Sequence, residues 1–164
     1  MKINTLVVST FFLIAATGCS DSNNSTKSVA SRSPIVTASS KIEKLGPEGL
    51  FEAAQPGWHS ASPPTYPESL TVDLLAPQEV KFIGLLQQDG QLARAPKSLR
   101  IETSSDGKTW TEAGGADDAC APNKPDGWVN IDLAKPITAQ HIRIVIFSNC
   151  GDTQFLTLRG LRVG

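Results

Sequence analysis

The sequence predicts an all-β domain, either a sandwich or a barrel, from three observations. First, several short runs alternate apolar and polar side chains with the period of a strand that buries one face. Second, one such run at residues 99–103 is followed by Asp106-Gly107, a tight-turn signal, so a β-hairpin is expected there. Third, no run of helical length with an apolar face follows Thr65. The other predicted strand segments are residues 70–74, 80–86, 129–133 and 141–147.

The first eighteen residues are predicted to be an export signal. Lys2 gives a charged start, and residues 6–16 are an apolar stretch too short to span a bilayer as a stable helix. The small residues before Cys19 resemble the lipobox of bacterial lipoproteins, in which the cysteine is acylated and becomes the new N-terminus. An ordinary cleaved signal peptide with an incidental cysteine is the alternative. Ser20 stands where an inner-membrane retention signal would place aspartate, which favours a lipid-anchored protein of the outer membrane in a bacterial cell envelope.

Residues 19–33 are expected to form a flexible tether. They are dominated by Ser, Asn, Lys and Thr and have almost no apolar surface to bury. The folded domain is therefore expected over residues 34–164, an ordinary size for one domain.

The domain begins with a stretch rich in glycine and proline. The density of these residues between Gly46 and Pro67 excludes a long helix or a central strand, although residues 48–54 have the composition of one short helical turn. The remainder, which contains Trp58 and His59, is expected to be an ordered loop. Trp58 is expected to cover the core and not to act as a ligand platform.

The later strands differ in how many of their faces are expected to be buried. Residues 70–74 and 142–146 alternate, so each is expected to turn one face to the core. Residues 80–86 are apolar on both faces, which is typical of a central strand. Arg143 and Arg162 alternate with apolar neighbours and are expected on solvated strand faces.

The chain has three cysteines, and acylation of Cys19 would leave Cys120 and Cys150. In an exported protein this pair is expected to form a disulfide, which would stabilise the fold by roughly 3–4 kcal/mol through loop closure. Two free, buried thiols are the alternative. The two histidines, His59 and His141, are far apart in the sequence, so no metal site is predicted and no cofactor is expected.

Charge and motif content exclude several function classes. The formal net charge is −1, which argues against a nucleic acid or an anionic lipid surface held by general electrostatics. The membrane is therefore expected to be contacted through the N-terminal lipid only. Asp117-Asp118 is typical of a solvated turn, and no arrangement of serine, histidine and acid is apparent. The protein is not expected to be an enzyme.

A succession of weak motifs, in a fairly specific order, resembles the discoidin family, also called coagulation-factor C-type domains. The motifs are Trp58-His59-Ser60 and residues 70–74, 97–110, 141–144 and 158–163. The resemblance covers nearly all of the expected mature chain. It implies a galactose-binding-like jelly-roll β-sandwich that serves as a binding module.

The resemblance also implies where a ligand would bind. Carbohydrate-binding members hold a sugar in loops at one end of the sandwich, commonly with an arginine, an asparagine, a histidine and an aromatic platform. Arg94 and Asn149 lie in loops that match the arginine and asparagine positions. His59 and Gln88 are the further candidates from this end of the domain.

Trp128 is the expected aromatic platform and is preferred over Trp58. It follows an inserted loop that a Cys120 disulfide would tie to the loop of Asn149, which would bring Trp128, Arg94 and Asn149 to one end of the sandwich. For each of these residues a structural role remains open: Arg94 as a solvated loop residue, and Trp128 as a cap on the core.

The sequence departs from the family in residues 52–57, where many sugar-binding members have an Asp-Gly-Asn loop that holds calcium; bound calcium is therefore not predicted.

The expected function is carbohydrate binding. The alternative is a protein–protein interaction or a structural role in the envelope. A sugar site needs polar groups beside an aromatic face, whereas a protein site would show a wider apolar patch.

The lipobox resemblance generates the first testable prediction. Cys19→Ser removes the thiol that would carry the lipid, so fatty-acid labelling is expected to disappear and the protein to leave the membrane fraction. Metabolic labelling with a palmitate analogue measures this directly. Unchanged labelling of Cys19→Ser would show that Cys19 is not the acylated residue.

Overall fold

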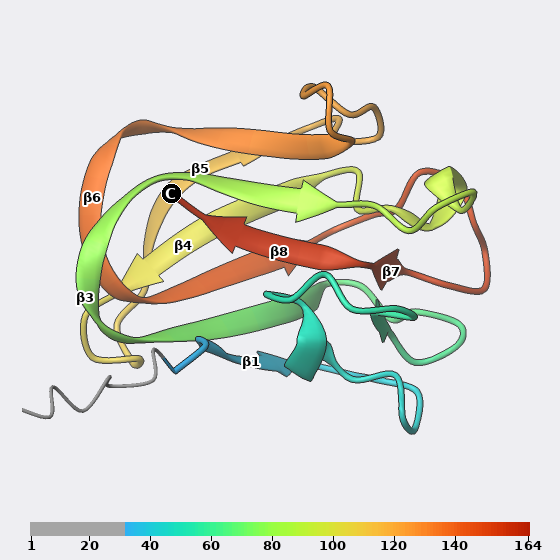
Figure 1. Cartoon of the computed structure of the whole chain (residues 1–164), viewed down its shortest axis with the longest axis horizontal. Helices are drawn as coiled ribbons and strands as arrows, with labels where there is room; N and C mark the ends of the chain where they lie inside the picture. The colour runs from blue at the N-terminus through green and yellow to red at the C-terminus, as the bar shows by residue number, and fades with distance from the viewer. Residues whose placement is uncertain (1–31) are drawn as a thin grey trace, which may run out of the picture. The chain divides into compact units, whose positions relative to one another are not determined.

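Two long antiparallel strands, β3 (Glu68–Leu86) and β6 (Trp128–Ile146), frame the computed structural model of the protein, which describes residues 32–164 (Figure 1). Each strand contains two of the predicted segments joined into one continuous element. The predicted export signal, the predicted acylation site Cys19 and nearly all of the predicted tether lie outside the described residues.

Both long strands bend, and the bends lie side by side (Figure 1). In β3, residues 75–79 are all exposed, and the pairing with β6 shifts register between Asp73 and Gln78. Leu75 has a φ of 67°, a conformation that side chains rarely adopt and that helps the strand to turn. The prediction treated residues 70–74 and 80–86 as separate strands because residues 75–79 break the alternation and include Pro77, a residue rarely found inside a strand.

The bends fold the sheet into two layers. In the first layer the strand order is β1 (Ile35–Ala38), the first half of β3, the second half of β6, β4 (Leu99–Ser104) and β5 (Thr111–Ala116). In the second layer the other half of β3 lies between the first half of β6 and β8 (Gly160–Val163), so residues 80–86 are central, as predicted. The pairing of β4 with β5 confirms the predicted hairpin.

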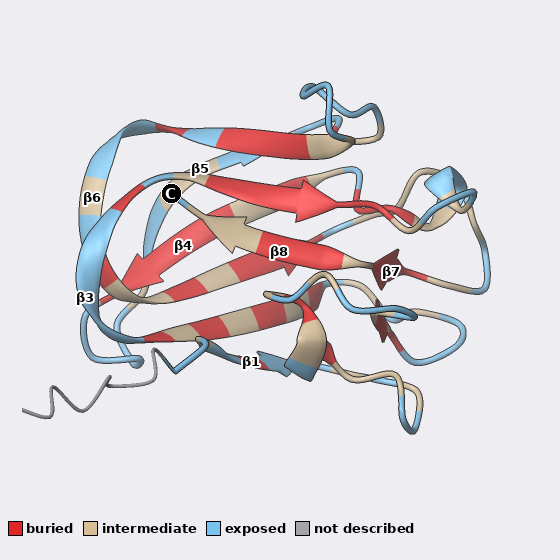
Figure 2. Cartoon of the chain, viewed as in Figure 1, coloured by how far each residue is buried: buried red, intermediate tan, exposed pale blue. Residues whose placement is uncertain are grey.

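The core fills the space between the two layers. Alternate residues of each long strand are buried, and Figure 2 shows the alternation along the first half of β3. The fold is therefore the predicted all-β sandwich. The buried residues of the two long strands include Leu70, Val72, Leu74, Ile83, Leu85, Val129, Ile131, Ile142, Ile144 and Ile146.

A short two-stranded sheet closes one end of the core. It pairs β2 (Trp58–His59) with β7 (Thr157–Leu158). Trp58 is fully buried and its indole N–H donates to the Ser40 carbonyl at 3.0 Å, so it covers the core as predicted. Gly57 precedes it with a φ of 79°, and a Cβ there would lie 2.4 Å from the Leu158 carbonyl oxygen, so the tight entry into β2 requires glycine.

Helical structure is confined to two short 3₁₀ turns in the described residues, η1 (Pro47–Gly49) and η2 (Leu92–Arg94). The first lies where a helical turn was expected. Within residues 32–164, no helix is long and apolar enough to cross a membrane.

Arg143 and Arg162 are not the solvated side chains that the sequence predicted. Arg143 donates to the buried Glu102 carboxylate at 2.6 Å, and its guanidinium lies 4.3 Å from the centroid of the Trp110 ring. Arg162 lies at the same distance over Trp128. The prediction failed because period-two alternation shows which face a side chain takes but not what neighbouring strands place beside it.

The predicted disulfide is confirmed: Cys120 and Cys150 are bonded, with their Cα atoms 5.7 Å apart. The bond joins the inserted loop between β5 and β6 to the loop that follows β6. The backbone N–H of Cys150 also donates to the Ala95 carbonyl at 3.0 Å. Three loops at this end of the sandwich are thus held together.

The disulfide generates a stability prediction. The bonded residues are 30 apart in sequence, so replacing both with serine is expected to lower the free energy of unfolding by roughly 3–4 kcal/mol through restored loop entropy. Urea unfolding followed by tryptophan fluorescence measures the change. The variant is still expected to fold, because the sandwich has its own core. An unchanged unfolding free energy would contradict this account.

Candidate ligand-binding site

The loop that carries Arg94 is joined by backbone contacts to the loop after β6. The N–H of Asp152 donates to the Ala93 carbonyl at 3.0 Å, and Pro96 forms an isolated β-bridge with Asn149. These contacts fix the 3₁₀ turn η2, at whose end Arg94 lies. Arg94 is therefore held beside Asp152, although the two are 58 residues apart.

Arg94 keeps most of its donors available. Its Nε donates to Asp152 Oδ2 at 3.0 Å, and its guanidinium carbon lies 4.5 Å from the centroid of the Phe155 ring. About a quarter of the side chain is exposed (26%). Among the described residues, the two terminal Nη groups have no hydrogen-bond partner, so four of the five guanidinium N–H donors remain available.

His59 contacts the same aromatic ring. It pairs with Thr157 across β2 and β7, and its ring meets Phe155 edge-on, with centroids 6.3 Å apart and planes at 72°. His59 Nε2 is buried and has no hydrogen-bond partner in residues 32–164. Burial lowers the pKa of His59, and the positive charge of Arg94 lowers it further, against a smaller opposing effect of a backbone hydrogen bond with Pro56.

Tyr66 adds a third polar group that lacks a partner. Its phenol oxygen is buried without a hydrogen bond in the described part of the chain. Burial raises the pKa of Tyr66, and the charge of Glu68 raises it further, against a smaller lowering by the Asn149 backbone. The Asp152 carboxylate also raises this pKa, so Tyr66 lies beside the loop of Asn149 and Asp152. His59, Tyr66, Arg94, Asp152 and Phe155 are called the loop-end cluster below.

Asp152 and Asn149 organise the loop that carries Phe155. Asp152 Oδ1 accepts hydrogen bonds from the backbone N–H groups of Gln154 and Phe155, both at 2.8 Å. The bond from Gln154 contributes most to lowering the pKa of Asp152, and Arg94 contributes less. Asn149 Nδ2 donates to the carbonyls of Asp152 and Phe155 at 2.6 and 2.7 Å, while its Oδ1 accepts the Gly151 N–H. Both amide hydrogens of Asn149 are therefore committed within the loop.

The structure brings together three of the predicted site residues and separates a fourth. Arg94, His59 and Asn149 meet at one end of the sandwich, and Gln88 Nε2 donates to the nearby Pro56 carbonyl at 3.2 Å. Trp128 is placed against Arg162 and not against Arg94, whose aromatic neighbour is Phe155.

Phe155, Asp152 and Tyr66 were not predicted. In the loop after β6, only Asn149 was predicted to bind a ligand, six residues before the aromatic ring. A lone phenylalanine directly after a polar loop was the available signal. Nothing in the sequence spacing connects Tyr66 to this loop.

The loop-end cluster offers hydrogen-bond donors, an imidazole nitrogen and a phenol around a partly exposed aromatic ring. Such groups suit a ligand rich in hydroxyls, since hydroxyls both donate and accept and an aromatic face covers their C–H side. Among residues 32–164, no group of three or more His, Cys, Asp or Glu side chains is placed to hold a metal ion.

Comparison with known proteins places the chain in a family. Residues 35–158 match the F5/8 type C domain, so the protein belongs to this family, which is the discoidin family that the sequence resembles. No curated protein matches the chain. The jelly-roll sandwich expected from the resemblance is confirmed by the similar solved structures.

Three similar structures illustrate the likeness. The chitosan-binding module 1 of a chitosanase/glucanase from Paenibacillus sp. IK-5 has a TM-score of 0.66 at 21% identity, over 82% of this chain and 96% of that one. The family 32 carbohydrate-binding module of Clostridium perfringens NanJ, in complex with galactose, has a TM-score of 0.64 at 17% identity, over 79% and 92%. A Clostridium perfringens module in complex with GalNAc-β-1,3-galactose has a TM-score of 0.60 at 22% identity, over 79% and 94%.

The environment of His59 generates a pH prediction. Because its pKa lies below the ordinary value of 6.5, its contribution to folding is complete above pH 6.5 and is lost as the pH falls through the folded-state pKa. Arg94→Met removes a nearby positive charge and is expected to raise the His59 midpoint in an NMR titration. Arg100→Met, which removes an arginine from β4, is the control and should leave the midpoint unchanged. A wild-type midpoint at or above 6.5 would contradict the described environment.

Proposed function

We propose that this protein is a non-catalytic carbohydrate-binding module that binds a sugar at the loop-end cluster. The observation that carries the proposal is the arrangement of Arg94 and His59 around the Phe155 ring, with unused polar atoms on both side chains. A sugar hydroxyl would receive hydrogen bonds from the Arg94 Nη groups. It would also satisfy the buried His59 Nε2, whose lack of a partner is costly in the free protein.

Comparison with the two arginines that lie over tryptophan rings supports a ligand role for Arg94. Arg143 uses Nε and Nη2 on the Glu102 carboxylate, and Arg162 uses Nη1 on Asp126 and Nη2 on Asn130. Both are also stacked on tryptophan rings. Arg94 is likewise placed on an aromatic ring, but only its Nε is bonded. Its terminal nitrogens are thus oriented but not occupied.

The similar structures support the same class of ligand. One is named as chitosan-binding, one was solved with galactose and one with GalNAc-β-1,3-galactose. Asn149, with both amide hydrogens committed, keeps only a lone pair of Oδ1 for a ligand. We assign it chiefly the positioning of Phe155 and Asp152.

The cellular setting that we propose rests on the N-terminal sequence. A lipid on Cys19 would hold the module at a bacterial outer membrane through the polar residues 20–33. A protein partner instead of a sugar would favour a continuous apolar surface. Only four large hydrophobic residues of the described chain are exposed, namely Ile35, Leu75, Leu92 and Phe147.

The proposal predicts the effect of removing each ligand group. Arg94→Ala and His59→Ala are each expected to weaken saccharide binding by about tenfold or more, because each removes at least one hydrogen bond made to the ligand. A glycan array identifies a binding saccharide, and calorimetry measures the affinities. Loss of the Arg94–Asp152 pair is expected to change stability little, since this ion pair is partly exposed.

Arg100→Ala is the matched control. Arg100 also lies over a phenylalanine, 5.4 Å from the Phe147 centroid, and pairs with Glu102 at 2.8 Å, but it belongs to β4 and not to the loop-end cluster. Its replacement is expected to leave saccharide affinity unchanged. The proposal fails if a broad array shows no saccharide binding, or if binding survives the Arg94→Ala/His59→Ala double variant.

A further inference from the structure

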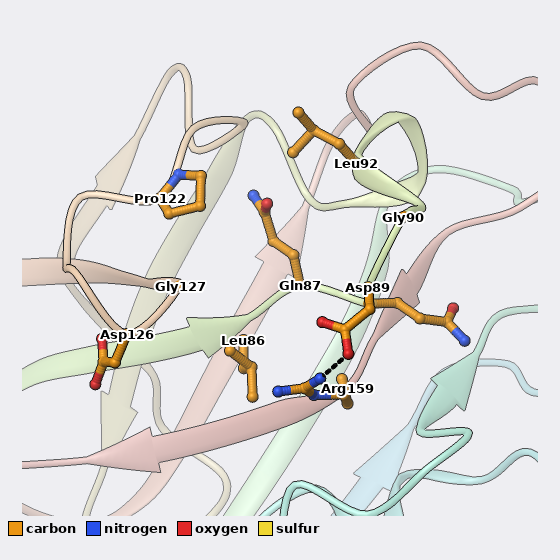
Figure 3. A pocket seen from close by; sticks show the side chains of 10 residues that line it. Leu86, Gln87, Asp89, Gly90, Leu92, Pro122, Asp126, Gly127 and Arg159 are labelled. Atoms are coloured by element: carbon orange, nitrogen blue, oxygen red, sulfur yellow. Dashed lines mark hydrogen bonds and ion pairs between the residues drawn. The ribbon is translucent and has the colours of Figure 1, made fainter.

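A separate cavity lies on the other side of the loop that carries Arg94. It has a volume of about 300 Å³ and is formed between residues 87–92 and the inserted loop at residues 122–127, with Leu86 and Arg159 below (Figure 3). This volume is at the lower end of the range of about 300–1,000 Å³ found for ligand sites. None of the loop-end cluster residues lines it.

Gln87 provides a fixed polar group in this cavity. Its side chain points into the space between Pro122 and Leu92 (Figure 3), and the residue is only 9% exposed. Its Nε2 donates to the carbonyls of Ala119 and Cys120 at 3.0 and 2.7 Å, which fixes the orientation of the amide. Its Oε1 accepts no hydrogen bond from the described residues, so a well-oriented acceptor is left for a ligand.

Two ion pairs at the cavity set its charge. Arg159 pairs with Asp89, and Asp126 pairs with Arg162 at 3.2 Å. The Asp89 and Asp126 side chains are 74% and 56% exposed, whereas those of Arg159 and Arg162 are 23% and 33% exposed. The carboxylates are thus the more solvent-accessible members of both pairs, and their free lone pairs can accept hydrogen bonds from hydroxyl or ammonium groups.

Donor and apolar groups complete the site. Arg159 lines the cavity, and among its terminal nitrogens only Nη1 has a hydrogen-bond partner within residues 32–164, which leaves Nη2 as a donor. Leu92 is 51% exposed and forms an apolar wall together with Leu86 and Pro122. A ligand here would therefore meet a donor, several acceptors and an apolar surface, the combination that suits a sugar ring.

The cavity is directly connected to the loop-end cluster through the backbone. Leu92 and Arg94 belong to the same 3₁₀ turn, so one faces the cavity while the other contacts Phe155. Gln88, which lines the cavity, donates to the carbonyl of Pro56, the residue that also hydrogen-bonds His59. The two sites therefore share one loop as their common wall.

We propose that this cavity is a second subsite, which receives a neutral or amino sugar unit of an oligosaccharide whose terminal unit binds at the loop-end cluster. The proposal rests on the proposed function of that cluster. It assigns the cavity a preference: units that offer hydroxyl or ammonium donors are favoured over uronic acids, because the accessible groups of both ion pairs are the Asp89 and Asp126 carboxylates.

The test compares chain lengths. The probes are galactose, GalNAc-β-1,3-galactose, glucosamine and its oligomers from two to six units, with oligogalacturonate as the anionic probe. For the wild-type domain, affinity measured by calorimetry is expected to rise about three- to tenfold from the single unit to the longer chains of the series that binds. The double variant Leu92→Ala/Asp89→Ala is expected to lose this rise while keeping single-unit affinity.

Both substituted side chains are well exposed, so the variant is expected to fold. Ile35→Ala/Glu112→Ala is the matched control, since it removes an exposed aliphatic residue and an exposed ion-paired acid from β1 and β5. It should keep the full dependence on chain length.

The outcomes separate the two proposals. If no probe and no array saccharide binds, the function proposed for the loop-end cluster fails, and the subsite with it. If single units bind but chain length has no effect, or the effect survives Leu92→Ala/Asp89→Ala, the second subsite is wrong while the first site stands. A gain in affinity for oligogalacturonate through the cavity would also overturn the assignment.

Discussion

The pairing of β3 with β6 is the constraint on which the rest of the domain depends. Each strand has 19 residues and runs through both layers, and β1, β4 and β8 all pair with one of the two. Because a one-residue slip would turn every core side chain outward, the alternation of buried residues also fixes the register. The shared bend near Leu75 then brings the two apolar faces together.

The ends of these strands set the positions of the loops that we assign to binding. β3 ends at Leu86, immediately before the cavity-lining loop, and β6 ends at Ile146, immediately before the loop of Asn149. The Cys120–Cys150 bond and the contacts of residues 93–97 with residues 148–152 join these loops. A rigid sandwich thus carries short loops that are cross-linked to one another, so little conformational entropy would be lost on binding.

The side chains of Arg94, Arg143 and Arg162 lie over aromatic rings but differ in how many of their guanidinium nitrogens already have a hydrogen-bond partner in the protein. Arg143 and Arg162 each lie over a tryptophan. Glu102 occupies two nitrogens of Arg143, and Asp126 and Asn130 occupy the two terminal nitrogens of Arg162. Arg94 lies over the Phe155 ring and donates to Asp152 through Nε only. The acid fixes the guanidinium without covering its terminal nitrogens, which is the form of pre-organisation that favours binding of a polar ligand.

The sequence alone determined the all-β class, the hairpin after residue 99, the buried Trp58 and the pairing of the two cysteines. These features follow from the alternation of apolar residues, from turn residues and from the number of cysteines, all of which can be seen without knowing the tertiary structure. The family resemblance pointed to Arg94, His59 and Asn149. Only the tertiary structure decided that Arg94 contacts the Phe155 ring and not Trp128. It also decided that Asn149 donates both amide hydrogens to carbonyls of its own loop and that Gln87 points into a cavity. These facts depend on contacts between residues distant in sequence, and such contacts are set by how the bent strands bring the loops together in space.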